Sequence, residues 1–177
     1  MKVSGGVRIR HATIEDLPAI VAIYNSTIPG RLATADLEPV PVESRVEWFH
    51  AHRPERHPLD VAEADGRIVG WVSLQPFYGR PAYAATAEVS VYVHETVRRQ
   101  GVGQALLFHI MELCPSLGIS TLLGFIFGHN TPSLRLFAKN GFETWARLPR
   151  VARLDDVERD LHILGRRLSD TRPPAGT

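Results

Sequence analysis

The sequence has little cysteine, no long hydrophobic run and almost no net charge, and each absence excludes a class of protein. A single cysteine, Cys114, in 177 residues excludes an internal disulfide framework. No apolar run reaches the roughly 18 residues that a membrane span needs, and residues 1–10 lack the apolar stretch of a signal peptide. The formal net charge of +1 gives no overall attraction for nucleic acid or a membrane surface. We therefore expect a cytoplasmic protein with neither nucleic-acid nor membrane partners.

The composition and hydrophobic pattern are those of a mixed globular domain. Hydrophobic residues make up 44% of the chain and charged residues 22%, which is ordinary for such a domain. We expect residues 1–170 to form a single domain and residues 171–177 to be a disordered tail. Periodicity predicts strands at 7–10, 61–64, 68–74, 86–93, 119–127, 142–148 and 160–168, helices at 13–28, 42–51, 101–114 and 130–140, and a loop over 149–159. Such a mixture indicates an α/β or α+β fold in which helices cover a sheet.

The most informative segment is the loop Arg98–Gly103, between a predicted strand and an amphipathic helix. The first N–H groups of a helix have no partner within it and lie at the positive end of its dipole, so they bind phosphate readily. Gly101 and Gly103 let the backbone approach a pyrophosphate without a side chain in the way. Arg98 and Arg99 add positive charge.

Three interpretations compete for this loop. It fits an ordinary strand-to-helix turn whose glycines serve backbone geometry alone. A dinucleotide-binding turn wants a third glycine where this sequence has Leu106, and a P-loop needs Gly-Lys followed by Ser or Thr, which is absent. The interpretation that remains is a pyrophosphate bound without a metal, as in coenzyme A.

The order of motifs around the loop resembles the GCN5-related N-acetyltransferase superfamily. The pattern of that family is Gln/Arg-x-x-Gly-x-Gly/Ala, a later Asn, and a helix that ends in Gly-Phe. The matching positions here are Arg98, Gly101, Gly103, Asn130 and Gly141-Phe142. The resemblance covers about residues 7–168 and implies a mixed, mostly antiparallel sheet of six to seven strands, flanked by about four helices. That sheet would splay apart where the pantetheine arm of acetyl-CoA inserts.

Two further segments are similar to the phosphinothricin and methionine sulfoximine acetyltransferase branch of that superfamily. They are Arg80-Pro81-Ala82-Tyr83 and the run from Glu88 to Val93. The resemblance implies that the main chain of Val91 to Val93 pairs with pantetheine, that residues 99–104 hold the pyrophosphate, and that Asn130 bonds the pantetheine arm. The implied cofactor-binding residues are Val91, Tyr92, Val93, Arg98, Arg99, Gln100, Gly101, Val102, Gly103, Gln104 and Asn130, with Ser133 near the adenine-nucleotide end.

Glu88 is the candidate catalytic base. An α-amino group has a pKa of about 8 and is largely protonated at neutral pH, so a base must remove its proton. We expect Glu88 to begin the apolar face of a strand that the loop places beside the cofactor, and a carboxylate in partly apolar surroundings titrates upward. The alternative is an edge-strand glutamate paired with an arginine; the resemblance favours the base.

The sequence departs from the superfamily at the position of its usual general acid. Many members have a tyrosine in the helix after the asparagine, and the corresponding residue here is Phe137. The branch also does without this tyrosine, so we expect Tyr92 or water to protonate the leaving thiolate, or the thiolate to leave unprotonated.

The acceptor is expected to be a small amino-acid-like amine. By resemblance, Arg80 would bind a substrate carboxylate, Tyr83 would close over the side chain, and Tyr92 would contribute from the strand. From the residues alone, Arg80 and Tyr83 are better explained as surface-loop residues, and only the resemblance favours their role in binding an amino-acid-like substrate. We expect direct transfer from acetyl-CoA, no metal, and a homodimer, since that branch commonly forms dimers.

Two other functions stay open. The first keeps acetyl-CoA and changes the acceptor to a polyamine, an aminoglycoside or a protein N-terminus. The second is a non-catalytic sensor that binds coenzyme A, for which Phe137 is the only support. The histidines His50, His52 and His57 match no standard zinc spacing, and Cys114 ends an apolar helical stripe, where it is expected to pack in the core.

Overall fold

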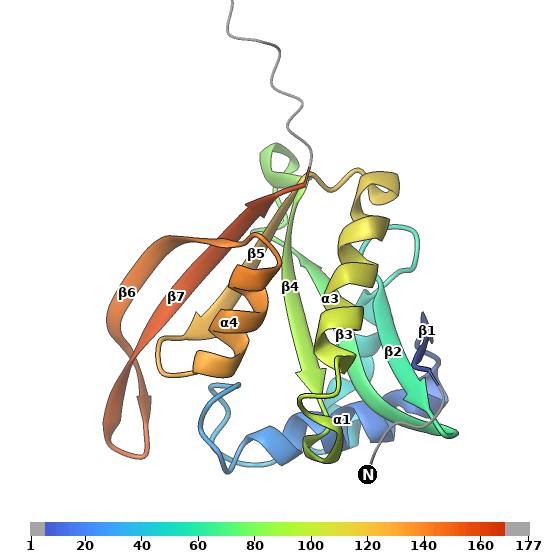
Figure 1. Ribbon diagram of the computed structural model, residues 1–177, viewed down its shortest axis with the longest axis horizontal. Helices are drawn as coiled ribbons and strands as arrows, with labels where there is room; N and C mark the ends of the chain where they lie inside the picture. The colour runs from blue at the N-terminus through green and yellow to red at the C-terminus, as the bar shows by residue number, and fades with distance from the viewer. Residues whose placement is uncertain (1–5, 169–177) are drawn as a thin grey trace, which may run out of the picture.

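The computed structural model describes residues 6–168, which form one seven-stranded sheet with helices on both faces (Figure 1). The strand order is β1-β2-β3-β4-β5-β7-β6, and every neighbouring pair is antiparallel except β4 with β5. The strands are β1 Arg8–His11, β2 Leu59–Ala64, β3 Arg67–Pro76, β4 Thr86–Val93, β5 Thr121–Phe127, β6 Glu143–Leu154 and β7 Val157–Arg167. The predicted mixed, mostly antiparallel sheet is confirmed. The expected tail at 171–177 lies outside the described residues.

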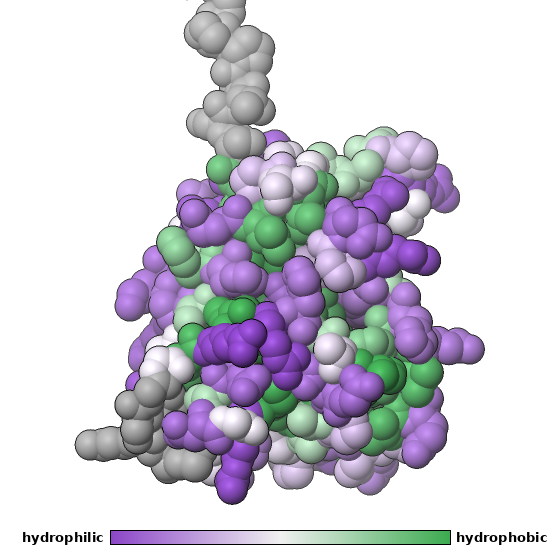
Figure 2. Space-filling view, turned by 90° about the vertical axis from the view of Figure 1, so that its right-hand side faces the viewer, coloured by the Kyte–Doolittle hydropathy of each residue, from purple (hydrophilic) through white to green (hydrophobic). Residues whose placement is uncertain are grey.

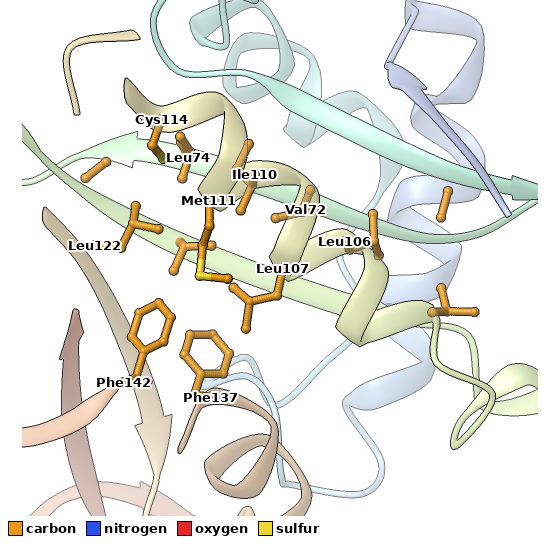
Figure 3. Packing of buried hydrophobic residues seen from close by; sticks show 14 of the residues in the cluster. Val72, Leu74, Leu106, Leu107, Ile110, Met111, Cys114, Leu122, Phe137 and Phe142 are labelled. Carbon is orange, nitrogen blue, oxygen red and sulfur yellow. The ribbon is translucent and has the colours of Figure 1, made fainter. Parts of the chain in front are cut away.

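Helices α3 and α4 cover one face of the sheet and α1 and α2 the other, so each face has its own apolar cluster. Leu106, Leu107 and Ile110 of α3 are fully buried in the larger cluster (Figure 3). Ile20 and Ile23 of α1 belong to the smaller one. The helices are α1 Leu17–Thr27, α2 Val46–Ala51, α3 Val102–Leu113 and α4 Thr131–Lys139, with 3₁₀ turns η1 Ile14–Asp16, η2 Val42–Arg45, η3 Pro81–Tyr83, η4 Glu95–Val97 and η5 Cys114–Leu117. The four predicted helices are therefore present.

The expected loop at 149–159 is wrong, because β6 and β7 continue as one long hairpin through that segment. Its turn is formed by Asp155 and Asp156, whose φ angles of 45° and 65° are the left-handed pair of a two-residue hairpin turn. The register of the two strands shifts around Pro149, which has no N–H to donate to a ladder. Asp-Asp is a weaker turn signal than Asp-Gly, so the pattern did not reveal the hairpin.

On the face shown in Figure 2, hydrophilic residues separate small groups of hydrophobic ones. Within the described part of the chain, no helix is long and apolar enough to cross a membrane.

Candidate active site

The sheet opens between β4 and β5. The two parallel strands pair at only three positions, ending with Glu88 opposite Leu123. Beyond that point β4 stays paired with β3, and β5 stays paired with β7, so the two strands diverge (Figure 1). The β5-facing edge of the main chain from Val89 to Val93 therefore borders a gap. An extended polar chain can pair with such an edge.

The N-terminus of α3 lies just after the open end of β4. Gly101 caps the helix with a φ of 85°, a left-handed conformation that suits glycine, and its carbonyl accepts the bond from the N–H of Ala105 at 2.9 Å. A Cβ on Gly101 would meet nothing within 4 Å, whereas one on Gly103 would lie 3.3 Å from Cδ2 of Leu136. Gly101 thus serves backbone geometry, and Gly103 allows α3 to approach α4.

The side chains of the loop divide between solvent and structure. Arg98 and Arg99 are exposed beside the helix N-terminus, while Val102 is buried in the core. The Gln100 amide donates to the carbonyl of Thr96 at 3.1 Å. Two cationic side chains and the unpaired N–H groups of a helix start therefore lie together, as an anion site requires.

Gln104 has a structural partner that the sequence did not reveal. Its Nε2 donates to Oδ1 of Asn140 at 2.6 Å, and Nδ2 of Asn140 donates back to Oε1 of Gln104 at 3.0 Å. Asn140 also donates to the carbonyl of Leu136 at 2.7 Å. The Gln104 side chain thus ties α3 to the end of α4, which leaves its main-chain N–H for an anion.

Asn130 caps α4 and also holds the loop between α1 and α2. Its Oδ1 accepts from the N–H of Ser133 at 3.2 Å, and its Nδ2 donates to the carbonyl of Leu32 at 2.9 Å. Tyr92 donates its hydroxyl to the next carbonyl, that of Ala33, at 3.2 Å. Sequence reasoning missed these loop contacts, because backbone carbonyls carry no sequence signal.

Glu88 lies on the face of β4 that looks toward α1 and α2. Side chains alternate along a strand, so Glu88, Ser90 and Tyr92 share this face, opposite the buried Val89. The expectation that Glu88 begins the apolar face is wrong by this parity. Glu88 is half-buried, burial raises its pKa, and no ion pair involves it among residues 6–168. The alternative of a structural pair with arginine finds no partner in that range.

A first cavity, the aromatic hollow, opens on this face next to Glu88. It has a volume of about 180 Å³ and lies between α1, α2 and strands β3 and β4. Trp71 stacks on Tyr92 with ring centroids 4.4 Å apart, and Trp48 meets Trp71 edge-on at 5.8 Å. Burial raises the pKa of Tyr92, so the phenol stays protonated. The hollow is lined by Ile20, Val21, Tyr24, Val40, Arg45, Trp48, Trp71, Ser73, Gln75, Ser90 and Tyr92.

A second cavity, the arginine hollow, contains the predicted substrate residues Arg80 and Tyr83. Its volume is about 440 Å³. Both residues are exposed, as the surface-loop interpretation expects, and Tyr83 meets Phe77 edge-on at 5.5 Å. The lining is Arg56, His57, Pro76, Phe77, Gly79, Arg80, Pro81, Tyr83, Ala84 and Thr86. Two arginines give this hollow the charge that a carboxylate ligand requires.

Phe137 and Cys114 are core residues. The Phe137 ring packs against Phe142 at 4.8 Å and covers Gly124, where a Cβ would come within 2.5 Å of it (Figure 3). Burial raises the pKa of the Cys114 thiol to about 12, which makes it a poor nucleophile. Within residues 6–168 no group of three or more His, Cys, Asp and Glu could hold a metal ion.

Known proteins share this architecture. The model of the acetyltransferase (GNAT) family matches residues 18–142. YwnH of Bacillus subtilis (strain 168) is 53% identical over 162 residues, which are 91% of this chain and 99% of that protein. The chain belongs to the acetyltransferase (GNAT) family. The predicted superfamily, its fold and the enzyme class, an acetyl-CoA-dependent N-acetyltransferase, are thereby confirmed.

Two other GNAT proteins carry more specific names. An L-methionine sulfoximine/L-methionine sulfone acetyltransferase of Pseudomonas paraeruginosa (strain DSM 24068 / PA7) is 33% identical over 168 residues, 93% of this chain and 96% of that protein. A solved phosphinothricin acetyltransferase from Sinorhizobium meliloti, in complex with AcCoA, is 25% identical with a TM-score of 0.88. It matches 97% of this chain and 93% of its own. The resemblance to this branch is confirmed.

The predicted site residues of this GNAT domain fall into two groups. Glu88, the free edge of β4 and the start of α3 all border the opening of the sheet, with Tyr92 beside them. Arg80 and Tyr83 line a separate hollow on the Glu88 side. Sequence reasoning missed Trp48 and Arg45, which line the aromatic hollow, because neither belongs to a motif.

Proposed function

We propose that this enzyme transfers the acetyl group of acetyl-CoA directly to the α-amino group of a small amino acid or analogue, of the methionine sulfoximine or phosphinothricin type. The observation that carries the proposal is the position of Glu88: a half-buried, unpaired carboxylate at the last paired position of β4 and β5, with one hollow on either side. The names of the relatives at 33% and 25% identity agree with such an acceptor.

The opening of the sheet fits acetyl-CoA. The free edge of β4 at Val91 and Val93 would pair with the pantetheine arm, and the N–H groups at the start of α3, with Arg98 and Arg99, would hold the pyrophosphate. Asn130 would have to exchange its bond to Leu32 for one to pantetheine. Ser133, in the first turn of α4, is proposed to lie toward the nucleotide. Acetyl-CoA supplies the acetyl group as a thioester.

Glu88 would remove the proton that the acceptor amine must lose. The amine nitrogen then forms a bond to the thioester carbonyl carbon, the carbon–sulfur bond breaks, and coenzyme A leaves as a thiolate. The nitrogen loses a second proton as it becomes an amide, and this proton is available to the thiolate. Tyr92 already donates its hydroxyl to Ala33, so we infer that water protonates the thiolate. Cys114, buried and with a raised pKa, is a poor candidate for an acetyl-enzyme intermediate, which supports direct transfer.

A thiol-release assay over amine classes tests the proposal. We expect release of coenzyme A with free amino acids and sulfoximines, and little with polyamines or aminoglycosides. Arg80→Ala should reduce kcat/KM for free amino acids by about tenfold or more, since a charged hydrogen bond contributes about 1.5–3 kcal/mol, and should leave amino-acid amides unaffected. Release with none of these amines, despite tight acetyl-CoA binding, would favour the sensor function instead.

Gly101→Ala tests the pyrophosphate site against a matched control. Gly101 and Gly118 both have positive φ, 85° and 71°, and a Cβ on either would meet nothing within 4 Å. Alanine should therefore strain both positions to a similar extent. We expect only Gly101→Ala to raise the KM for acetyl-CoA, on the order of tenfold if one charged hydrogen bond is lost. An equal rise in both variants would refute the site.

We propose a homodimer that forms through the β6–β7 hairpin. Strand β6 is the edge of the sheet, and its residues Trp145 and Val151 expose 45% and 57% of their surface, while Val157, at the start of β7 in the same hairpin, exposes 46%. An edge strand with exposed large hydrophobic residues is a ready pairing surface. Sedimentation that finds only monomers at micromolar concentration would contradict this. The cytoplasmic location and the single domain at 1–170 stay predictions.

A further inference from the structure

The two hollows lie on opposite sides of Glu88 along one strand. Register places Glu88 opposite Gln75 and Ser90 opposite Ser73. Ser90 lines the aromatic hollow, and Thr86, two residues before Glu88 on the same face, lines the arginine hollow. An amino acid whose amine meets Glu88 would therefore have one cavity for its carboxylate and another for its side chain.

The size and walls of the aromatic hollow fit an apolar group. A cavity of 150 Å³ with apolar walls binds benzene in another protein, and this one measures about 180 Å³. Seven of its eleven lining residues are aromatic or aliphatic, and Arg45, Ser73, Gln75 and Ser90 are the other four; the aromatic rings are those of Tyr24, Trp48, Trp71 and Tyr92, and the aliphatic side chains those of Ile20, Val21 and Val40. Flat aromatic walls bury a ring or a branched chain well.

The charges around the hollow cancel. Arg45 is the one charged residue in the lining, and its guanidinium bonds Oδ2 of Asp36 at 3.1 Å and lies 5.0 Å over the Tyr24 ring. Tyr24 donates its hydroxyl to the same carboxylate at 2.5 Å. An anionic side chain would compete with Asp36 and approach Glu88, while a cationic one would meet Arg45. Either charged side chain would also lose its hydration on entering the hollow, which costs free energy.

We propose that the aromatic hollow is the subsite for the acceptor side chain, and that it selects neutral apolar side chains of about the size of a benzene ring over charged ones. The inference rests on the proposed function, because it assumes an amino-acid acceptor. Trp48 and Ser73 set the dimensions of the subsite, while the carboxylate goes to the arginine hollow. Among the acceptors named for relatives, neutral methionine derivatives are then preferred to anionic phosphinothricin.

The wild-type enzyme gives the first test, with acceptors that share the α-amino and α-carboxylate groups. We expect kcat/KM for L-phenylalanine and L-leucine to exceed that for L-glutamate and L-lysine at least tenfold, since apolar pockets discriminate by about 10–200-fold per methylene-sized change. L-Methionine sulfone should exceed phosphinothricin by a similar factor. Equal rates for leucine and glutamate would overturn the inference while leaving the proposed function intact. Turnover of no amino acid would overturn both.

Two variants with opposite expected effects exclude misfolding as the explanation. Ser73 is 2% exposed in the wall, so Ser73→Leu should fill the hollow and lower the ratio of kcat/KM for L-phenylalanine to that for L-alanine at least tenfold. Trp48→Ala should enlarge it and raise the ratio for L-tryptophan to L-phenylalanine. Phe108→Ala, an aromatic deletion on the exposed side of α3, should change neither ratio. Unchanged ratios in both hollow variants would assign the side chain elsewhere.

Discussion

Glu88→Gln is expected to lower kcat with amino-acid acceptors by about 10²–10⁴-fold, the contribution of a positioned general base. Glutamine keeps the shape and the hydrogen-bonding capacity of the side chain but accepts no proton. The KM for acetyl-CoA should change little, because Glu88 lies on the face of β4 toward α1 and α2, whereas the proposed pyrophosphate site is at the N-terminus of α3 on the other face. Steady-state kinetics with both substrates varied would measure the two effects separately.

The pH dependence of kcat tests whether the loss of activity in Glu88→Gln comes from the loss of a base. Burial raises the pKa of Glu88 above its ordinary value of 4.5, and the base acts only when deprotonated. Activity of the wild type should therefore fall as the pH drops through that raised pKa, and this acid limb should be missing from the residual activity of Glu88→Gln. Glu112→Gln, an exposed carboxylate on α3, serves as the control and should keep the limb. Full kcat in Glu88→Gln across the pH range would remove Glu88 from the mechanism.

Stability should change in the opposite direction to activity. A carboxyl group whose pKa is raised by folding favours the folded state below its unfolded pKa, and loses that advantage as the pH rises through the folded value. At pH 8 the half-buried Glu88 carboxylate therefore lowers the stability of the folded state, and glutamine removes this cost. The Tm of Glu88→Gln at pH 8 should equal or exceed that of the wild type.

Phe137→Ala should destabilise the protein by about 3–5 kcal/mol, the usual cost of deleting a buried phenylalanine ring. Phe137 is 4% exposed and packs between Phe142 and Gly124, so α4 loses its main contact with β5. The close approach to Gly124 leaves no room for another residue to fill the cavity. Urea denaturation followed by circular dichroism measures the free energy of unfolding.

Phe108→Ala is the matched control for this deletion. Its ring is 55% exposed on α3, so the change should stay within about 0.5 kcal/mol, as surface substitutions usually do. A loss in Phe137→Ala no larger than that of the control would mean that the ring does not hold α4 on the sheet.

Local signals in the sequence were enough to predict the strands, the helices and the glycine-bearing turn at the start of α3. The turn Asp65-Gly66, with φ angles of 49° and 71°, has the residue types that such a turn needs. Gly101, at the start of α3, likewise has the left-handed conformation that a glycine at this position indicates. These features depend on neighbours in the chain, so a single sequence reveals them.

What the sequence did not reveal depends on residues far apart in the chain. Gln104 and Asn140 are 36 positions apart, and no sequence motif marks the two hydrogen bonds between their side-chain amides. The aromatic hollow joins Trp48 of α2 to Trp71 of β3 and Tyr92 of β4 only after folding. Each of these tryptophans alone looks like an ordinary core residue, so the cavity between them could not be predicted.

Three consecutive carbonyls hold the loop that connects α1 to α2. The carbonyl oxygen of Arg31 accepts a hydrogen bond from His129 at 2.7 Å, that of Leu32 from Asn130 at 2.9 Å, and that of Ala33 from Tyr92 at 3.2 Å. Every amino acid carries the same carbonyl group, so the side chains at positions 32 and 33 can be exchanged without losing these anchors, whereas the Arg31 side chain also bonds Asp155 and the carbonyl of Leu37. Libraries randomised at positions 32 and 33 should therefore keep the path of the loop, which makes these two positions a practical place to alter acceptor preference by directed evolution.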